Sequence, residues 1–299
     1  MDLTALHGPD GSPNRPGPGL SNGLRATSCY RADVDLTARH DPFRPIDRPE
    51  AGPLEAVWLG RADYRSVWAL QKEFAAARAV GTIGDRLLLV EHPAVLTLGR
   101  HADESHVRAT SDELAARGVE LIRVERGGEV TYHGPGQLVA YPIIALARRG
   151  LLVRPLVRAL EAAMIETCAA FGLKADRRDG HPGCWIAPEG ADPRKIGALG
   201  IRIERGVSYH GIALNIDPDL DDFALIDACG MPDVVSTSIA AEIRRVGGLR
   251  STATIAEGAA LFAVAFAGQI GVVLAGFGSA TDGGMSAGAA RSGVLATVG

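Results

Sequence analysis

The amino-acid sequence predicts an α+β domain in which helices pack on a mixed β-sheet. Apolar residues recur with helical spacing over residues 64–77 and 157–171, so each segment is expected to bury one helical face. Residues 86–92, 196–203 and 207–216 are apolar runs bounded by charged or turn residues, which is typical of strands. The irregular alternation of the two kinds of segment favours this fold class.

The ends of these elements carry their own signals. The first helix is expected to end at Gly81 and the second at Gly172, since glycine commonly ends a helix. Residues 204–206, Glu-Arg-Gly, are expected to form the turn between the last two strands. Thr254 and Glu257 predict a capping box ahead of a final long helix.

Residues 258–278 are apolar and long enough to raise the alternative of a membrane span. Their one polar side chain belongs to Gln269. The segment is rich in glycine and alanine, and it has neither a flanking lysine or arginine nor an aromatic belt. We therefore predict a buried helix that runs into a strand.

The sequence divides into three regions. Residues 1–53 are predicted to be a disordered arm, because eight of the twelve residues from 8 to 19 are glycine or proline and prolines continue to residue 53. Residues 54–275 are the predicted folded domain. Residues 276–299 are rich in glycine, serine and alanine and are predicted to be a flexible tail.

The bulk composition excludes several classes of protein. A net charge of −4 gives no electrostatic footprint for nucleic acid or for an anionic membrane surface. The sequence contains no glycine-rich phosphate-binding motif. Its four cysteines form neither a CxxC pair nor a zinc spacing, and no secretion signal is seen, so a cytoplasmic location with free thiols is expected.

The densest polar segment is RGGEVTYHGPGQLVAY, residues 126–141. Its glycines allow positive φ and a close approach of the backbone to a ligand, and Pro135 stiffens the turn. Its polar residues are Arg126, Thr131, Tyr132, His133 and Gln137. The segment predicts a binding site, with an ordinary glycine–proline hairpin as the alternative.

Lysine is rare in this chain, which carries only Lys72, Lys174 and Lys195. Lysine, unlike arginine, can lose its proton near neutral pH. Lys195 opens an otherwise apolar strand, beside Gly197 and Gly200. A strand-end lysine in water is the alternative.

Four cysteines compete for the role of a reactive thiol. Cys229 precedes a glycine in a short predicted loop, where a thiol is expected to be exposed. Cys168 lies on the apolar stripe of the second helix and is expected to be inert. Cys184, in a glycine–proline loop beside Trp185, is a weaker candidate, and Cys29 lies in the arm.

The triplet Tyr-His-Gly occurs twice, around His133 and around His210. Paired histidines can ligate a metal, but no third ligand appears at a fitting spacing, so no metal site is expected. We predict instead that both histidines line one pocket as hydrogen-bond donors, with His210 as a further candidate pocket residue.

Five segments together resemble the octanoyltransferase family of lipoate synthesis, the lipoyl(octanoyl) transferases. They are EHPAVLTLGR (91–100), RGGEVTYHGPGQLVAYP (126–142), KIGALGIRI (195–203), VSYHGIALNI (207–216) and IDACGM (226–231). The occurrence of all five in order makes the resemblance specific. It implies the fold shared by biotin and lipoate protein ligases, with residues 54–275 as the catalytic domain.

The resemblance also implies a reaction. An octanoyl group passes from octanoyl-acyl carrier protein to a cysteine, and then to the target lysine of a lipoyl domain. Such acceptors are found in the 2-oxoacid dehydrogenases and in the H protein of the glycine cleavage system. Cys229 corresponds to the acyl-carrying cysteine and Lys195 to its partner. The resemblance implies no cofactor, and no interaction with nucleic acid or a membrane. It also implies that the protein is a monomer.

The implied substrate-binding residues form three groups. The first group is Arg126, Gly127, Gly128, Glu129, Val130, Thr131, Tyr132 and His133. The second is Ala198, Leu199 and Gly200, and the third is Gly211, Ile212 and Ala213.

The chemistry of a thioester relay agrees with these residues. Exchange between two thioesters is nearly isoenergetic, so no ATP-binding loop is required. Only about a few per cent of a free thiol is ionised at pH 7, and Lys195 is expected to raise that fraction either by accepting the proton or, as an ammonium, by stabilising the thiolate. Lys195 is also expected to accept the proton of the attacking amine. Backbone amides near Leu199 and Gly200, together with His133, are the expected donors to the oxyanion.

Two alternatives remain open. An ATP-dependent lipoate or biotin ligase uses a lysine to bind an acyl-adenylate and needs no cysteine nucleophile. A non-catalytic acyl-binding scaffold needs neither Cys229 nor Lys195. The presence of both residues favours the transferase.

Overall fold

The computed structural model describes residues 52–227, 234–247 and 253–279, which belong to the compact unit 46–299. Nearly all of the predicted arm and tail lies outside them. The helices are α1 (Tyr64–Val80), α2 (Ser111–Ala116), α3 (Val153–Ala170), α4 (Ile239–Arg245) and α5 (Ile255–Gln269). The strands are β1 (Leu54–Arg61), β2 (Arg86–Glu91), β3 (Val95–Leu98), β4 (Glu120–Arg123), β5 (Val130–His133), β6 (Gln137–Ile143), β7 (Ala175–Arg178), β8 (His181–Ile186), β9 (Arg194–Glu204), β10 (Val207–Asn215), β11 (Val235–Ser236) and β12 (Leu274–Ser279).

Two sheets organise these strands. In the described part of the chain, nine strands form a mixed sheet in the order β12-β1-β2-β6-β10-β9-β8-β7, with β11 paired to β9. β1 is parallel to both β12 and β2, whereas the pairs from β2 to β7 are antiparallel. A smaller sheet has the order β4-β3-β5. The predicted α+β class with a mixed sheet is confirmed.

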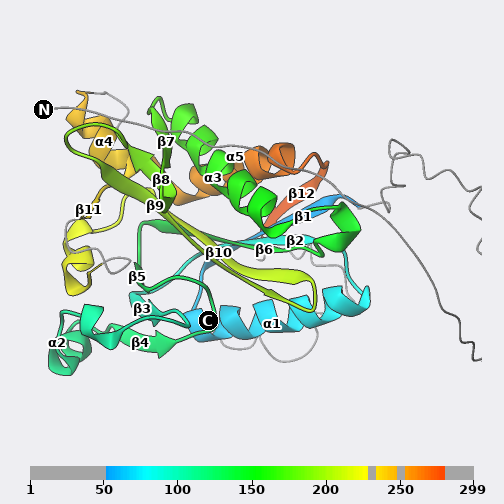
Figure 1. Cartoon of the computed structure of the whole chain (residues 1–299), viewed down its shortest axis with the longest axis horizontal. Coiled ribbons are helices and arrows are strands. Elements are labelled where there is room, and N and C mark those ends of the chain that lie inside the picture. Colours follow the sequence, from blue (N-terminus) through cyan, green and yellow to red (C-terminus); the bar gives the residue numbers. More distant parts are fainter. Residues whose placement is uncertain (1–51, 228–233, 248–252, 280–299) are drawn as a thin grey trace, which may run out of the picture. The chain divides into compact units, whose positions relative to one another are not determined.

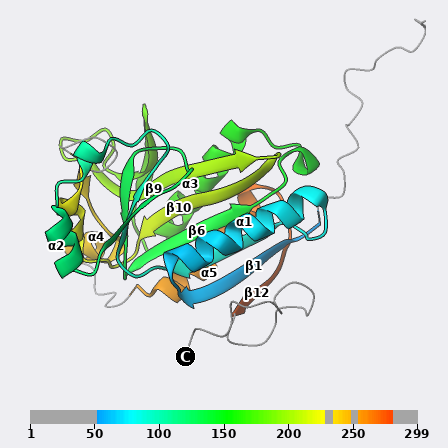
Figure 2. The same ribbon diagram turned by 90° about the horizontal axis from the view of Figure 1, so that it is seen from below.

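Helices cover both faces of the large sheet. α3 and α5 lie on one face and α1 lies on the other (Figures 1 and 2). Leu87 and Leu89 of β2 point into the core beneath α3 and α5, while Leu88 and Val90 point into the core beneath α1. Successive side chains of a strand face opposite sides, so a strand covered on both faces is apolar throughout.

α1 begins and ends where the sequence predicts. The Asp63 side chain accepts a hydrogen bond of 2.9 Å from the backbone N–H of Ser66, which satisfies a free donor of the first turn. Gly81 ends the helix with a φ of +82°, a conformation that favours glycine. Tyr64 and Phe74 of the predicted stripe are buried, so α1 presents that face to the sheet.

Residues 258–278 form the predicted helix and strand, but the helix is buried on one face only: Phe262 and Phe266 are fully buried, whereas Val264 is 64% exposed. The Thr254 hydroxyl accepts a hydrogen bond of 3.2 Å from the backbone N–H of Glu257 and starts α5. β12 then pairs in parallel with β1 and continues to Ser279, beyond the predicted domain end at residue 275. In the part of the chain that the structure describes, no helix is long and apolar enough to cross a membrane.

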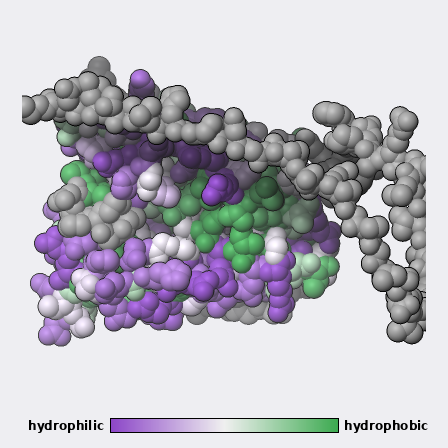
Figure 3. Space-filling view, viewed as in Figure 1, coloured by the Kyte–Doolittle hydropathy of each residue, from purple (hydrophilic) through white to green (hydrophobic). Residues whose placement is uncertain are grey.

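β9 and β10 form the predicted hairpin. Arg205 and Gly206 have φ values of +49° and +78°, and positive φ at both central residues is typical of a type I′ turn. Among the described strands, β9 pairs on its other edge only from Arg194 to Gly197. Residues 198–203 are half-buried, and Figure 3 displays apolar surface over this hairpin.

The segment around Pro135 does not form the hairpin considered as the alternative. β5 pairs with β3 in the small sheet, whereas β6 pairs with β2 and β10 in the large sheet. The turn between them therefore carries the chain from one sheet to the other. A Cβ on Gly134 would lie 2.0 Å from the Tyr132 hydroxyl oxygen, and one on Gly136 would lie 2.2 Å from the Asp217 carbonyl oxygen. Both glycines are needed for this crossing.

Candidate active site

The three predicted substrate-binding groups meet at one cavity of about 30 Å³, which we name the central cavity. Its lining comprises Tyr64, Arg126, His133, Val139, Tyr141, Ala198, Gly200, His210, Gly211, Ile212 and Ala213. Residues from all three groups, and His210, are therefore brought together. Val139 and Tyr141 belong to the predicted binding segment 126–141, whereas Tyr64 lies on the predicted helical stripe and only the packing of α1 identifies it as a cavity residue.

The pairing of β9 with β10 brings the second and third groups together. Gly200 lies directly opposite Gly211. A Cβ on Gly200 would lie 2.7 Å from the carbonyl oxygen of Gly127, and a Cβ on Gly211 would lie 1.9 Å from that of Ala140. Backbone approaches this close leave no room for a side chain, so these glycines let the neighbouring segments pack against the cavity.

Lys195 lines a second cavity, of about 20 Å³, which we name the lysine cavity. Its lining comprises Thr131, Gln137, Lys195, Gly197, Ala198, Ala213, Asn215, Phe223 and Ser236. Ala198 and Ala213 line both cavities. Lys195 is 7% exposed, and its Nζ lies 5.3 Å from the centre of the buried Trp185 ring. The alternative of a strand-end lysine in water is wrong.

Arg126 holds its own loop against the sheet. Its Nη2 donates to the carbonyl oxygen of Thr97 at 2.6 Å, and its Nη1 donates to that of Gly127 at 3.0 Å. The backbone N–H of Gly127 donates to the carbonyl oxygen of Ile201 at 3.1 Å, on the open edge of β9. The guanidinium is thus used to close the wall of the central cavity, and 7% of the residue is exposed.

A buried hydrogen-bond chain connects His133 with the strand of Lys195. His133 Nδ1 lies 2.7 Å from Gln137 Oε1, and Gln137 Nε2 donates to Asn215 Oδ1 at 2.9 Å. Asn215 Nδ2 donates to the carbonyl oxygen of Thr237, whose own N–H donates to the carbonyl oxygen of Lys195. The two cavities therefore share one polar support.

This chain fixes the tautomer of His133. Gln137 Nε2 also donates to the carbonyl oxygen of Tyr132, so the amide nitrogen faces two acceptors and Oε1 must accept from His133 Nδ1–H. Burial, the charge of Arg126 and the neighbouring histidines lower the pKa of His133 to about 3. In the neutral ring Nε2 carries a lone pair. The ring therefore presents an acceptor at Nε2 in this structure, and not the expected donor to an oxyanion.

His92 and His210 are also neutral. Burial lowers the pKa of His92 to about 4, and its Nδ1 and Nε2 contact the Ala62 carbonyl and the Tyr141 hydroxyl at 2.7 and 2.9 Å. Burial and neighbouring cations lower the pKa of His210 to about 3. Across the residues that the structure describes, no three His, Cys, Asp or Glu side chains are grouped to hold a metal ion.

The cysteines divide as follows. Cys168 of α3 is fully buried, as predicted. Cys184 is wrongly predicted to lie in a loop: it is fully buried in β8, and the adjacent Cys168 thiol and burial raise its pKa well above the usual value. Neither thiol is accessible for acyl transfer. Cys29 and Cys229 lie outside the described residues.

The remaining residues of the predicted groups line neither cavity. Tyr132 donates to Asp222 Oδ2 at 2.5 Å, and Val130 is buried in the small sheet. Glu129 Oε2 lies 3.2 Å from His106 Nδ1. Leu199 packs on the core beneath α3 and α5. Gly127 and Gly128 form the loop that Arg126 closes.

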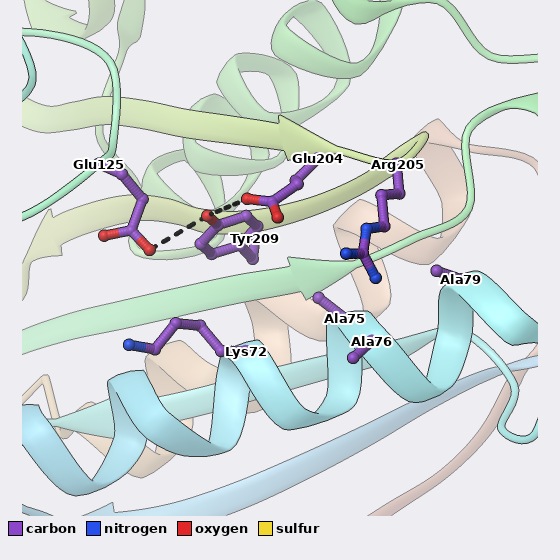
Figure 4. A pocket seen from close by; sticks show the side chains of 8 residues that line it. All are labelled: Lys72, Ala75, Ala76, Ala79, Glu125, Glu204, Arg205 and Tyr209. Atoms are coloured by element: carbon purple, nitrogen blue, oxygen red, sulfur yellow. Dashed lines mark hydrogen bonds between the residues drawn. The ribbon is translucent and has the colours of Figure 1, made fainter.

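A third cavity, of about 140 Å³, contains no residue of the predicted site. It lies between α1 and the turn end of β9 and β10 (Figure 4). Ala75, Ala76 and Ala79 line its helical side. The Tyr209 hydroxyl lies 3.1 Å from both Glu125 Oε1 and Glu204 Oε2 across the opening.

The mixed sheet with helices on both of its faces defines a domain with the fold of the lipoate protein ligases. One similar structure is a bipartite lipoate protein ligase with its E2 lipoyl domain from Thermoplasma acidophilum (TM-score 0.55, 14% identity, 76% of this chain and 87% of that chain). Another is lipoate-protein ligase A bound with ATP (TM-score 0.53, 15% identity, 76% and 88%). These likenesses establish the fold.

The chain belongs to the family of the lipoyl protein ligase A/B catalytic domain, which matches residues 63–265. An octanoyltransferase of Chloroflexus aggregans is 47% identical over 191 residues, covering 64% of this chain and 85% of that relative. Octanoyltransferases of Acidobacterium capsulatum and Mycobacterium tuberculosis are each 44% identical, covering 73% and 72% of this chain and 92% and 90% of the relative. The resemblance found in the sequence is confirmed.

Proposed function

We propose that this protein transfers an octanoyl group from octanoyl-acyl carrier protein, through a thioester on Cys229, to the target lysine of a lipoyl domain. The observation that carries the proposal is the wall of Ala198 and Ala213 that the central and lysine cavities share. It gives an acyl chain an apolar surface next to the buried Lys195 amine. The names of the similar octanoyltransferases supply the acyl group, and the archaeal ligase with its E2 lipoyl domain suggests the acceptor.

In the first half-reaction, the Cys229 sulfur attacks the thioester carbonyl of the donor. The bond from the carbonyl carbon to the carrier sulfur breaks as the new carbon–sulfur bond forms. Lys195 accepts the Cys229 proton and returns it to the departing carrier thiolate. One thioester replaces another, so no ATP is consumed.

In the second half-reaction, the target lysine amine attacks the acyl-Cys229 carbonyl. An amide bond forms, the thioester breaks, and Lys195 passes a proton of the amine to the Cys229 sulfur. The backbone amides of Leu199 and Gly200 are the proposed oxyanion donors, since His133 presents an acceptor. Ser236, just after the segment of residues 228–233 that contains Cys229, pairs with Lys195.

Intact mass spectrometry after incubation with octanoyl-acyl carrier protein tests this proposal. The wild-type protein should gain one octanoyl mass, and Cys229→Ala should gain none. Cys168→Ala is the control and should still form the adduct, because that thiol is fully buried. An adduct that persists in Cys229→Ala contradicts the mechanism. Activity with free octanoate and ATP, but none with the carrier protein, would assign the chain to the ligases instead.

We further propose that this protein acts as a cytoplasmic monomer.

A further inference from the structure

The His210 side chain lines the central cavity without a part in the proton transfers. It is 1% exposed, and neither Nδ1 nor Nε2 has a hydrogen-bond partner among the described residues. Its φ is +54° within β10, a left-handed conformation that residues other than glycine rarely adopt. Buried polar atoms are nearly always paired, and backbone strain of this kind concentrates where a ligand binds. Both features therefore indicate that the ring faces a ligand.

The surroundings of His210 enforce its position. The Gln71 Oε1 of α1 accepts a hydrogen bond of 2.8 Å from the His210 backbone N–H. The Tyr209 ring stacks on the imidazole with centres 5.0 Å apart, and the Tyr141 ring meets it edge-on at 6.4 Å. The backbone of His210 is thus held by α1, and its ring is packed by the Tyr209 and Tyr141 rings.

The ring of His210 offers one donor and one acceptor. The pKa of the His210 ring is lowered, first by burial and then by the positive charges of Arg126, Lys72 and Arg202, so the ring is neutral. A neutral imidazole has a hydrogen on one nitrogen and a lone pair on the other. A hydroxyl group, which both donates and accepts, is a fitting partner for such a ring, whereas a methyl group is not.

His210 lies at the end of the central cavity remote from the reacting end. Along β9, Lys195 is followed by Ala198, which borders both cavities, and then by Ile201, which lies opposite His210. At about 3.3 Å per residue, Ala198 and Ile201 are roughly 10 Å apart. A medium-length acyl chain whose thioester is near Lys195 therefore brings its last carbons toward His210.

Resting on the proposed function, we propose that His210 is a specificity-determining residue that forms a polar stop at the distal end of the acyl chain. A chain of eight carbons ends before the ring. An additional methylene group covers the unpaired nitrogens and shields them from any polar partner, which disfavours longer alkyl chains. A chain of the same length that ends in a hydroxyl group pairs with them instead.

An isosteric pair of donors tests the polar stop in the wild-type protein, where folding is not in question. Nonanoyl- and 8-hydroxyoctanoyl-acyl carrier protein have chains of equal length that differ only in a terminal methyl or hydroxyl group. Equimolar competition, read as the ratio of the two adducts by intact mass, should favour the hydroxyl chain. A preference for the methyl chain overturns the proposal.

Two variants separate polarity from volume. His210→Leu keeps most of the volume and removes both nitrogens, so the hydroxyl-to-methyl ratio should fall by about tenfold. His210→Asn tolerates positive φ and keeps a donor and an acceptor, so it should retain the hydroxyl preference. If His210→Leu leaves the ratio unchanged, the stop is not His210.

A matched control comes from another buried, neutral histidine. His92 does not line the central cavity, and its ring nitrogens have protein partners. His92→Leu should leave the adduct ratio unchanged, and a shift equal to that of His210→Leu would refute a specific role. Failure of the proposed function is distinguishable, because the wild-type protein would then form no adduct with any chain.

Discussion

The Gln137 side-chain amide donates to Asn215 Oδ1 at 2.9 Å and so connects β6 with β10 at the border of the lysine cavity. Gln137 is 2% exposed and Asn215 is 5% exposed, so water cannot replace this bond. Each residue also supports a neighbour. Gln137 accepts from His133, and Asn215 donates to the carbonyl oxygen of Thr237, whose backbone N–H donates to the carbonyl oxygen of Lys195. The position of the lysine thus depends on an amide two strands away.

Gln137→Leu should destabilise the protein and slow acyl transfer. The substitution leaves His133 Nδ1 and Asn215 Oδ1 buried without partners, and each such group costs about 1–3 kcal/mol. We expect the free energy of unfolding in urea to fall by about 3 kcal/mol. Gln269→Leu is the control, since Gln269 is exposed on α5 and its loss should change stability by less than about 0.5 kcal/mol. Equal losses in the two variants would show that burial of the amide is unimportant.

Lys195→Arg should be nearly as damaging as Lys195→Ala. A guanidinium keeps its charge at all working pH values and cannot accept a proton. General acid–base catalysis contributes about 10²–10⁴ in rate, so a loss of at least about a hundredfold is expected in single-turnover transfer to a lipoyl domain. Lys174→Arg should retain the wild-type rate, because Lys174 is exposed beyond α3. Substantial activity in Lys195→Arg would show that Lys195 acts only through its positive charge and not as a proton acceptor.

Local patterns in the sequence are sufficient to predict those helices and turns whose ends depend only on adjacent residues. The stripe of α1, its end at Gly81 and the turn at Arg205–Gly206 were all predictable, because caps and turns depend on adjacent residues. The segment around Pro135 was different. Its turn residues are those of a hairpin, but the strands on either side pair with partners far along the chain. Such pairing depends on contacts between residues far apart in the sequence, and a short stretch of sequence does not show which strands will pair.

The same division holds for the site. The motifs marked the glycine loop, Lys195 and the β9–β10 segments, which the structure brings together around two cavities. They did not mark Tyr64, whose place in the central cavity comes from the packing of α1 on the large sheet. The environment of Cys184 was also missed, since Gly183 and Trp185 suggest a loop when read alone. Buried polar chains such as Gln137–Asn215 arise only from tertiary pairing.

The three buried histidines should make the fold sensitive to acid. The pKa of His92 is about 4 and those of His133 and His210 are about 3, whereas an unfolded histidine has a pKa of about 6.5. Between these values the unfolded chain binds up to three more protons than the folded one. Stability therefore falls as pH drops below about 6.5, by as much as about 4 kcal/mol per pH unit.

Denaturant unfolding at a series of pH values between 6.5 and 4 measures this effect. The slope of the unfolding free energy against pH should approach the value for a difference of three bound protons, about 4 kcal/mol per pH unit, in the wild-type protein. His92→Gln should remove about one proton from that slope, because Gln does not titrate. His101→Gln is the control and should leave the slope unchanged, since His101 is exposed. A wild-type slope near zero would mean that the histidines are hydrated and protonate in the folded state.

Gly200→Ala should narrow the central cavity while leaving the fold intact. The new Cβ would lie 2.7 Å from the Gly127 carbonyl oxygen and 3.3 Å from Arg126 Cδ, so the loop on the open edge of β9 must move. We expect a loss of about 1–3 kcal/mol in stability and a larger loss in the rate of adduct formation. Gly84→Ala is the matched control, because nothing lies within 4 Å of its Cβ and its φ is not positive. If Gly200→Ala forms the octanoyl adduct at the wild-type rate, the loop held by Arg126 does not form the acyl-binding wall.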